Sequence, residues 1–133
     1  MTFNCNNEAV LSFTSEKFVV DAHLESAGPD PTGVAGTGGL AAVVLGPNST
    51  DTAGHLTVTG TGAATDTITL TYSGPYEGSV QCVFLSARNA AAATGITNGY
   101  FITTTTTEFV ITFVGVTGAN PEFDYFVIDP SPP

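Results

Sequence analysis

The strongest constraint on the fold is a two-residue alternation of apolar and polar side chains that recurs along the chain. In residues 17–25 every second residue is apolar, and the pattern returns in residues 54–59, 66–72 and 108–114. Successive side chains of a β-strand point to opposite faces, so this period predicts strands with one buried face. The 3.6-residue period of an amphipathic helix does not occur, and residues 90–93 are expected to form one helical turn at most.

Short strands separated by turns rich in glycine and proline are typical of a β-sandwich. The apolar run Val80–Leu85 predicts a central strand, and Thr103–Thr107 is expected to form a hairpin between two strands. The sequence therefore predicts an all-β protein, an antiparallel β-sandwich or jelly roll of eight or nine strands. The expected strands lie near residues 9–13, 17–25, 40–45, 54–59, 66–72, 79–86, 99–105, 108–114 and 122–128.

A length of 133 residues predicts one domain. Residues 28–39 are rich in glycine and proline and are expected to form a loop. This loop separates a β-sandwich domain at 40–128 from residues 1–27, whose one or two strands either complete the sandwich or reach across to a neighbouring protein as an N-terminal arm. The proline-rich tail at 129–133 cannot continue a strand ladder because proline lacks the amide donor.

The charge balance excludes two classes of partner. The chain has two basic residues, Lys17 and Arg88, against twelve acidic ones, and its formal net charge is −10. Two cations cannot neutralise a phosphate backbone or an anionic membrane surface, so we expect no nucleic-acid and no membrane partner. The first 20 residues lack the pattern of a signal peptide, and the uncharged stretch 31–50 is broken by proline and glycine.

Histidines and cysteines are few and widely spaced. His23 and His55 fall on the polar side of their strands and are expected to lie on solvated faces, since no metal-binding spacing surrounds them. Cys82 shares the alternation of apolar neighbours, so we expect it to be buried and inert. Cys5 and Cys82 form either one disulfide or, as the simpler interpretation, two reduced thiols.

Motifs for catalysis or cofactor binding are weak. Glu122 and Asp124 share one face of a strand and could hold Ca²⁺ through their oxygens, or they could form a solvated strand edge that resists mispairing. Residues 36–39 lack the lysine and the strand-helix context of a phosphate-binding loop. Neither a nucleophile motif nor an obvious carboxylate pair is evident. We therefore expect no enzyme, no catalytic residues, no resident metal and no cofactor.

Several segments resemble, in this order, a β-rich module of structural proteins from tailed bacteriophages. They are residues 48–62 with 66–70, the strand and Asn-Ala-Ala-Ala segment at 80–93, the threonine-rich hairpin at 100–113, and the closing strand at 123–128. The resemblance extends from about Leu40 to Ile128 and leaves residues 1–27 uncovered.

This resemblance implies a virion structural protein that forms a homotrimer. Because the module fills nearly the whole chain, we expect a capsid decoration (cement) protein, which would bind the major capsid protein on the outer surface of the head. The alternative is a receptor-binding subunit of a tail fibre or another appendage. Candidate apolar contacts with the capsid or between protomers are Phe3, Leu11, Phe13 and Phe18, although the same side chains could fill the domain's own core.

Overall fold

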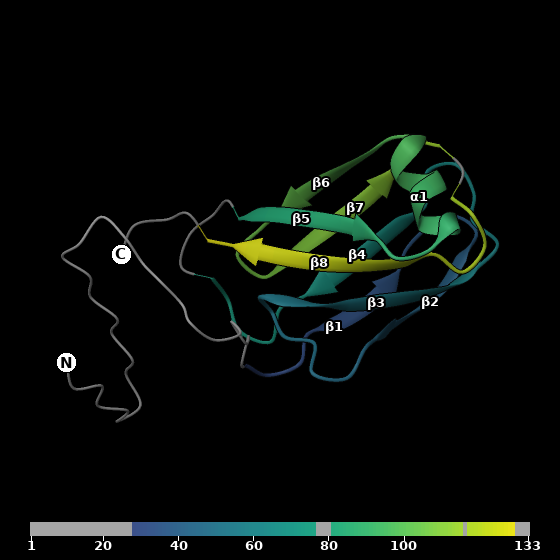
Figure 1. Cartoon of the computed structure of the whole chain (residues 1–133). Helices are drawn as coiled ribbons and strands as arrows, with labels where there is room; N and C mark the ends of the chain where they lie inside the picture. Colours follow the sequence, from purple (N-terminus) through teal and green to yellow (C-terminus); the bar gives the residue numbers. More distant parts are fainter. Residues whose placement is uncertain (1–27, 77–80, 116, 130–133) are drawn as a thin grey trace, which may run out of the picture.

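Two antiparallel sheets of four strands pack face to face, and a short helix lies at one end of the sandwich (Figure 1). The computed structural model describes residues 28–76, 81–115 and 117–129. The elements are β1 (Thr32–Ala35), β2 (Leu40–Leu45), β3 (Ala53–Gly60), β4 (Thr67–Thr71), β5 (Cys82–Ala87), α1 (Ala90–Thr97), β6 (Tyr100–Thr104), β7 (Glu108–Phe113) and β8 (Glu122–Ile128).

The strand order is β1-β4-β7-β6 in one sheet and β2-β3-β8-β5 in the other, and every pairing is antiparallel. The antiparallel β-sandwich predicted from the sequence is confirmed, while the finer jelly-roll expectation stays a prediction. The hairpin between β6 and β7 is also confirmed, because the Thr105 amide donates to the Glu108 carbonyl oxygen at 2.9 Å. The expected strands at 9–13 and 17–25 lie outside the described residues.

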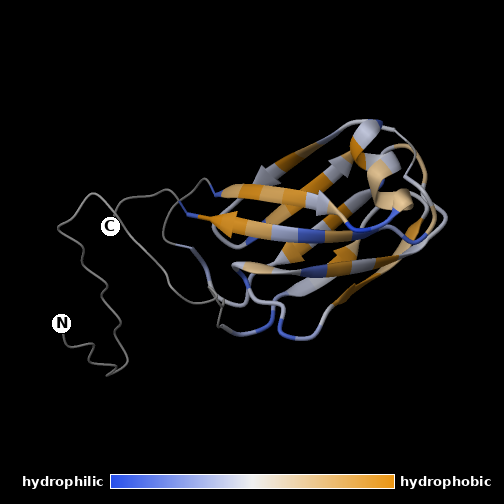
Figure 2. Cartoon of the chain, in the orientation of Figure 1, coloured by the Kyte–Doolittle hydropathy of each residue, from blue (hydrophilic) through white to orange (hydrophobic). Residues whose placement is uncertain are grey.

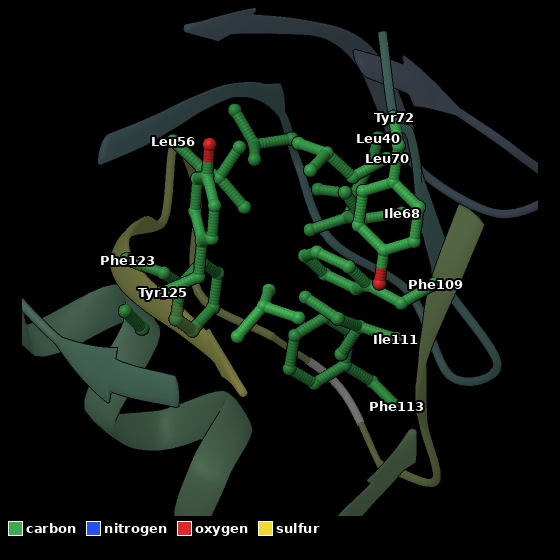
Figure 3. Close-up of a cluster of buried hydrophobic side chains, with 13 residues drawn as sticks. Leu40, Leu56, Ile68, Leu70, Tyr72, Phe109, Ile111, Phe113, Phe123 and Tyr125 are labelled. Carbon is green, nitrogen blue, oxygen red and sulfur yellow. The ribbon is translucent and has the colours of Figure 1, made fainter. Parts of the chain in front are cut away.

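The inward side chains of the alternating strands form the core between the sheets (Figure 3). Phe109 and Phe113 of β7 are fully buried, and so is Phe123 of β8, whose ring stacks on Phe113 with centroids 5.5 Å apart. Burying one such side chain contributes about 1.5–3 kcal/mol. Burial also raises the pKa of the tyrosine phenols at the edge of this core, Tyr72 and Tyr125.

Two strand predictions are corrected. Residues 28–39 were expected to form a loop, but β1 lies within them and pairs with β4. Gly33 lets β1 approach β2 of the other sheet closely, because a Cβ at this position would lie 2.5 Å from Cγ1 of Val43. The strand expected to be central, at 79–86, is β5, and β5 lies at the edge of its sheet.

The helix is longer than the single turn expected, since α1 extends over eight residues. Its buried positions are Ala92 and Gly95, so small residues rather than a stripe of large ones face the sandwich. A Cβ on Gly95 would lie 3.1 Å from the Phe113 ring, which shows how closely the helix approaches the core. Close packing through small residues explains why the sequence shows no 3.6-residue apolar period. None of the described helices is long and apolar enough to span a membrane.

A buried carboxylate holds the loops together near α1. Asp66 is fully buried and accepts hydrogen bonds from the amides of Gly39 and Ala63 and from the Thr117 hydroxyl. Gly38 adopts a φ of +122°, and a Cβ at this position would overlap the Asp66 carboxylate. The glycines at 36–39 therefore serve the tight approach of a loop to a buried acid.

Candidate functional site

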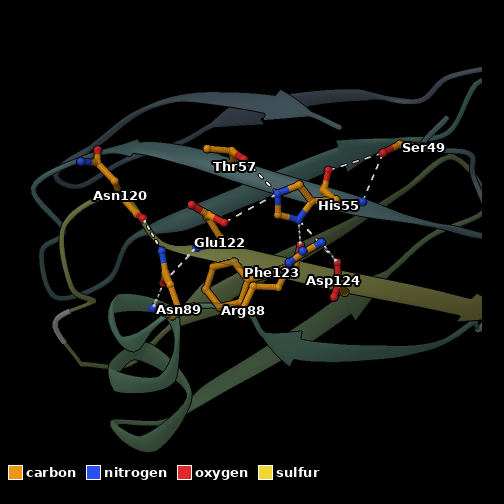
Figure 4. A network of polar contacts seen from close by, with 10 residues as sticks. Ser49, His55, Thr57, Arg88, Asn89, Asn120, Glu122, Phe123 and Asp124 are labelled. Atoms are coloured by element: carbon orange, nitrogen blue, oxygen red, sulfur yellow. Dashed lines mark hydrogen bonds and ion pairs between the residues drawn. The ribbon is translucent and has the colours of Figure 1, made fainter. Parts of the chain in front are cut away.

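A polar cluster lies on the outer face of the β2-β3-β8-β5 sheet (Figure 4). We call it the His55 cluster, and it comprises His55 and Thr57 of β3, Glu122 and Asp124 of β8, and Arg88 after β5. Strand register brings these side chains together, because His55 pairs with Asp124 and Thr57 with Glu122. The expectation that Glu122 and Asp124 share a face of one strand agrees with this arrangement. β8 is an inner strand, however, so the strand-edge interpretation of these two acids is wrong.

The contacts of His55 favour one tautomer of the neutral imidazole. Nδ1 lies 3.2 Å from the Phe123 carbonyl oxygen, which can only accept, so Nδ1 donates. Nε2 is then free to accept from the Thr57 hydroxyl at 3.1 Å. Asp124 Oδ1 lies 3.4 Å from Nδ1 and 3.3 Å from NH1 of Arg88. The imidazole and Asp124 thereby connect β3, β8 and the end of β5.

A hydroxyl, an imidazole and a carboxylate in this order resemble the catalytic arrangement of hydrolases. Such chemistry also requires free donors aimed at an oxyanion. Thr57 is in the middle of a sheet, opposite Val44 of β2 and Glu122 of β8, so the amides around it belong to the strand ladders. We interpret the His55 cluster as a polar link between strands.

The same geometry disfavours a metal centre. Glu122 Oε2 lies 3.9 Å from Nε2 of His55, whereas Asp124 approaches Nδ1, so the two carboxylates contact opposite sides of the ring. Within the described part of the chain, no group of three His, Cys, Asp or Glu side chains is arranged to hold a metal ion. His23 and Cys5 lie outside the described residues.

Cys82 is exposed, and the expectation that it is buried is wrong. The alternation in β5 turns Val83 and Leu85 toward the core and turns Cys82 and Phe84 outward. Phe84 lies opposite Phe126 of β8, and the two side chains are 59% and 39% exposed. These two aromatic residues form an apolar pair on the sheet's outer face. Figure 2 shows that much of β5 and part of β8 are hydrophobic, as orange stretches of the two strands.

The opposite sheet has an outer face of a different kind, which we call the threonine face. It consists of the outward residues of β1, β4, β7 and β6, and its central row is Val34, Thr69, Val110 and Thr103. Within these four strands Glu108 is the only charged residue. The threonines of this face are Thr32, Thr67, Thr69, Thr71, Thr103 and Thr112.

The residues expected to make contacts, Phe3, Leu11, Phe13 and Phe18, lie outside the described residues. The sequence expectations named no individual contact residue within the sandwich itself. The signal for a docking surface was present in the repeated Thr-x-Thr pattern of 67–71, together with the absence of charge in β1, β4 and β6. Comparisons with protein-family models, with curated proteins and with solved structures found no significant match to this chain.

Proposed function

We propose that this chain is a virion structural protein, a capsid decoration (cement) protein that binds the major capsid protein lattice from outside and stabilises the head. The proposal combines the resemblance of residues 40–128 to a phage structural module with the surface chemistry of the sandwich. On this proposal the protein acts through a surface complementary to its partner, and no residue is assigned to catalysis.

The observation that carries the proposal is the near absence of charge on the threonine face. Seven acidic residues belong to the described part of the chain, and of these Glu108 alone falls on this four-stranded face. The centres of protein interfaces are depleted in charged residues, because an unpaired charge is costly to desolvate. A broad neutral face on an acidic protein is therefore a suitable docking surface for another protein.

Side-chain entropy also favours this face. Threonine and valine are branched at Cβ and have few accessible rotamers, so immobilising them at an interface costs little entropy. The other sheet carries the His55 cluster, where His55 and Arg88 already contact carboxylates. We assign the threonine face to the capsid and the His55 cluster to the solvent side.

The proposal is tested by adding the purified full chain to heads that lack decoration and measuring cosedimentation. Saturable binding at lattice stoichiometry is expected. Thr69→Glu places a charge in the central row of the threonine face and should weaken binding at least tenfold, or about 1.4 kcal/mol. Thr59→Glu makes the same change at an exposed position on the other sheet and should leave binding unchanged.

Both variants are first compared with the original chain by thermal unfolding, so that a folding defect is separated from a binding defect. Equal binding by the two variants would show that the threonine face is not the docking surface. Absence of saturable head binding would overturn the decoration function, and binding to host cells instead would support the receptor-binding alternative.

A further inference from the structure

The outer edge of β5 has main-chain groups that no described strand uses. β5 pairs on one side with β8, and the Arg88 amide donates to the Glu122 carbonyl oxygen at 2.9 Å. In an antiparallel ladder the main-chain groups of successive residues alternate between the two sides of a strand. Phe84 therefore directs its groups toward β8, whereas Val83 and Leu85 present theirs at the open edge.

The four edge strands of the described sandwich differ in how well they are protected. Charged side chains, prolines, bulges and very short strands normally keep another strand from pairing with an edge. β1 has four residues and follows Pro31, and the register of β2 shifts between Leu40 and Ala42. β5 and β6 have no charge, no proline and an uninterrupted register, so both are open to pairing.

These two unprotected edges lie on the same side of the sandwich. Gly33 brings β1 close to β2, so the two sheet orders place β6 across from β5, and Figure 1 shows both along its upper side. Their inward residues Val83, Leu85 and Ile102 pack against the core but are only partly buried. A second sheet placed against this side would cover these side chains.

The outer face beside β5 fits a second copy of itself about a two-fold axis. Phe84 is 59% exposed and lies opposite Phe126, which is 39% exposed. If two β5 strands pair with Phe84 opposite Phe84, the four rings of the two copies form one row across the joined sheet. Val83 of each copy then faces Leu85 of the other, and their main-chain groups bond to each other. Aromatic pairs between neighbouring strands stabilise a sheet.

Charge also favours this edge for contact between identical copies. The formal net charge is −10, so two copies repel each other wherever unpaired carboxylates meet. The row of Phe84 and Phe126 and the next row, Cys82 with Ile128, carry no charge. We propose that two copies of this chain associate through β5, whose strands pair antiparallel about a two-fold axis and join two four-stranded sheets into one.

The size of the contact sets its strength. A phenylalanine side chain has roughly 200 Å² of surface, so the exposed parts of Phe84 and Phe126 in two copies supply at most about 400 Å². Stable interfaces bury about 1,200 Å² or more, and the two strand edges have to supply the rest. The contact is thus at the small end, and we expect a dimer that dissociates on dilution in the micromolar range.

Analytical ultracentrifugation of the full chain from about 1 to about 500 μM measures this equilibrium. Phe84→Glu sets two carboxylates against each other at the two-fold axis and should raise the dissociation constant at least tenfold. Val44→Glu is the matched control, because Val44 is 56% exposed on the outer face of the same sheet, on the opposite edge strand β2. It adds the same charge and should leave the dissociation constant nearly unchanged.

A chain that stays monomeric over this range would overturn the proposal, and so would equal weakening by the two variants. A trimer would contradict two-fold pairing and would support the homotrimer that the resemblance implies.

Disulfide trapping tests the register. With Phe84 opposite Phe84, Ser86 of one copy lies opposite Cys82 of the other, at a position where Cβ atoms are about 4.5–5.5 Å apart. Cys5→Ser leaves Cys82 as the one native thiol. In this background Ser86→Cys should form a covalent dimer on oxidation, seen on a denaturing gel without reductant. Val44→Cys is the control and should cross-link at least tenfold more slowly.

Positions 82 and 86 of one strand are roughly 13 Å apart, too far for a disulfide within one copy. Equal cross-linking from positions 86 and 44 would indicate random collision and would contradict the pairing. Both experiments use the protein without capsids. The dimer does not rest on the decoration function, so the failure of one is distinguishable from the failure of the other.

Discussion

Two tyrosines at the edge of the core differ in the hydrogen bonding of their hydroxyl groups. The Tyr125 hydroxyl donates to the Thr50 carbonyl oxygen, whereas the Tyr72 hydroxyl has no hydrogen-bond partner among the described residues. Both rings are buried, with exposed fractions of 3% for Tyr125 and 6% for Tyr72. A buried hydroxyl that makes no hydrogen bond retains the cost of its desolvation, about 1–3 kcal/mol.

Replacement by phenylalanine should therefore have opposite effects at the two positions. Tyr72→Phe is expected to raise the free energy of unfolding by about 1 kcal/mol, because it removes an unsatisfied polar atom. Tyr125→Phe is expected to lower it by about 1–2 kcal/mol, because it leaves the Thr50 carbonyl oxygen without that donor. Urea denaturation of the two single variants measures both values. Equal destabilisation would show that the Tyr72 hydroxyl is satisfied in solution.

The burial of some residues could be predicted from the sequence, and that of others could not. Alternation correctly predicted that Leu70 and Phe109 face the core, because the side chains of a strand have a fixed period. Burial of Asp66 could not be predicted in this way. Its donors come from Gly39, Ala63 and Thr117, and the last lies 51 positions away, so only the folded loops bring them together.

At the scale of elements, α1 depends on one side chain before its first turn. Asn89 Oδ1 accepts from the amides of Ala92 and Glu122, and Nδ2 donates to the Asn120 carbonyl oxygen. The residue therefore caps the helix and attaches it to the start of β8. The Asn-Ala-Ala-Ala sequence contained this capping signal, although the missing apolar period led to the expectation of a single turn.

Asn89→Ala should destabilise the protein by about 2 kcal/mol, at the upper end of the range for loss of a cap, because it also removes two links to the strand. Asn89→Asp keeps the acceptor and loses only the donor to Asn120, so its loss should be about half as large. Chemical denaturation followed by circular dichroism gives both values. If the two variants behave alike, the donor to Asn120 rather than the cap is the important contact.

Prediction of strand position has a similar limit. The composition of β5 is that of a central strand, yet β5 lies at an edge. Local sequence reports how apolar a strand is, but the number of its neighbours depends on pairings with distant segments such as β8. β5 also lacks the charges and prolines that usually keep another strand from pairing with an edge.

For the whole molecule, the distribution of charge matters more than its total. The formal net charge is −10, and among the described residues Arg88–Asp124 is the only ion pair between permanently charged side chains. Both side chains of this pair are about half exposed, so the pair contributes less than about 1 kcal/mol to the free energy of unfolding. Packing and strand pairing therefore stabilise the fold against a net electrostatic repulsion.

Salt should consequently stabilise this protein. Raising NaCl from about 0.05 to about 0.5 M shortens the Debye length from roughly 14 to 4 Å, which weakens repulsion among the carboxylates. We expect the Tm of the full chain to rise by a few degrees, whereas a fold dependent on exposed ion pairs would lose stability. Arg88→Gln is the control, because removal of the single pair should leave the salt response nearly unchanged. A Tm that falls with NaCl would show that attractive charge pairs, formed within the chain or between its copies, outweigh the repulsion.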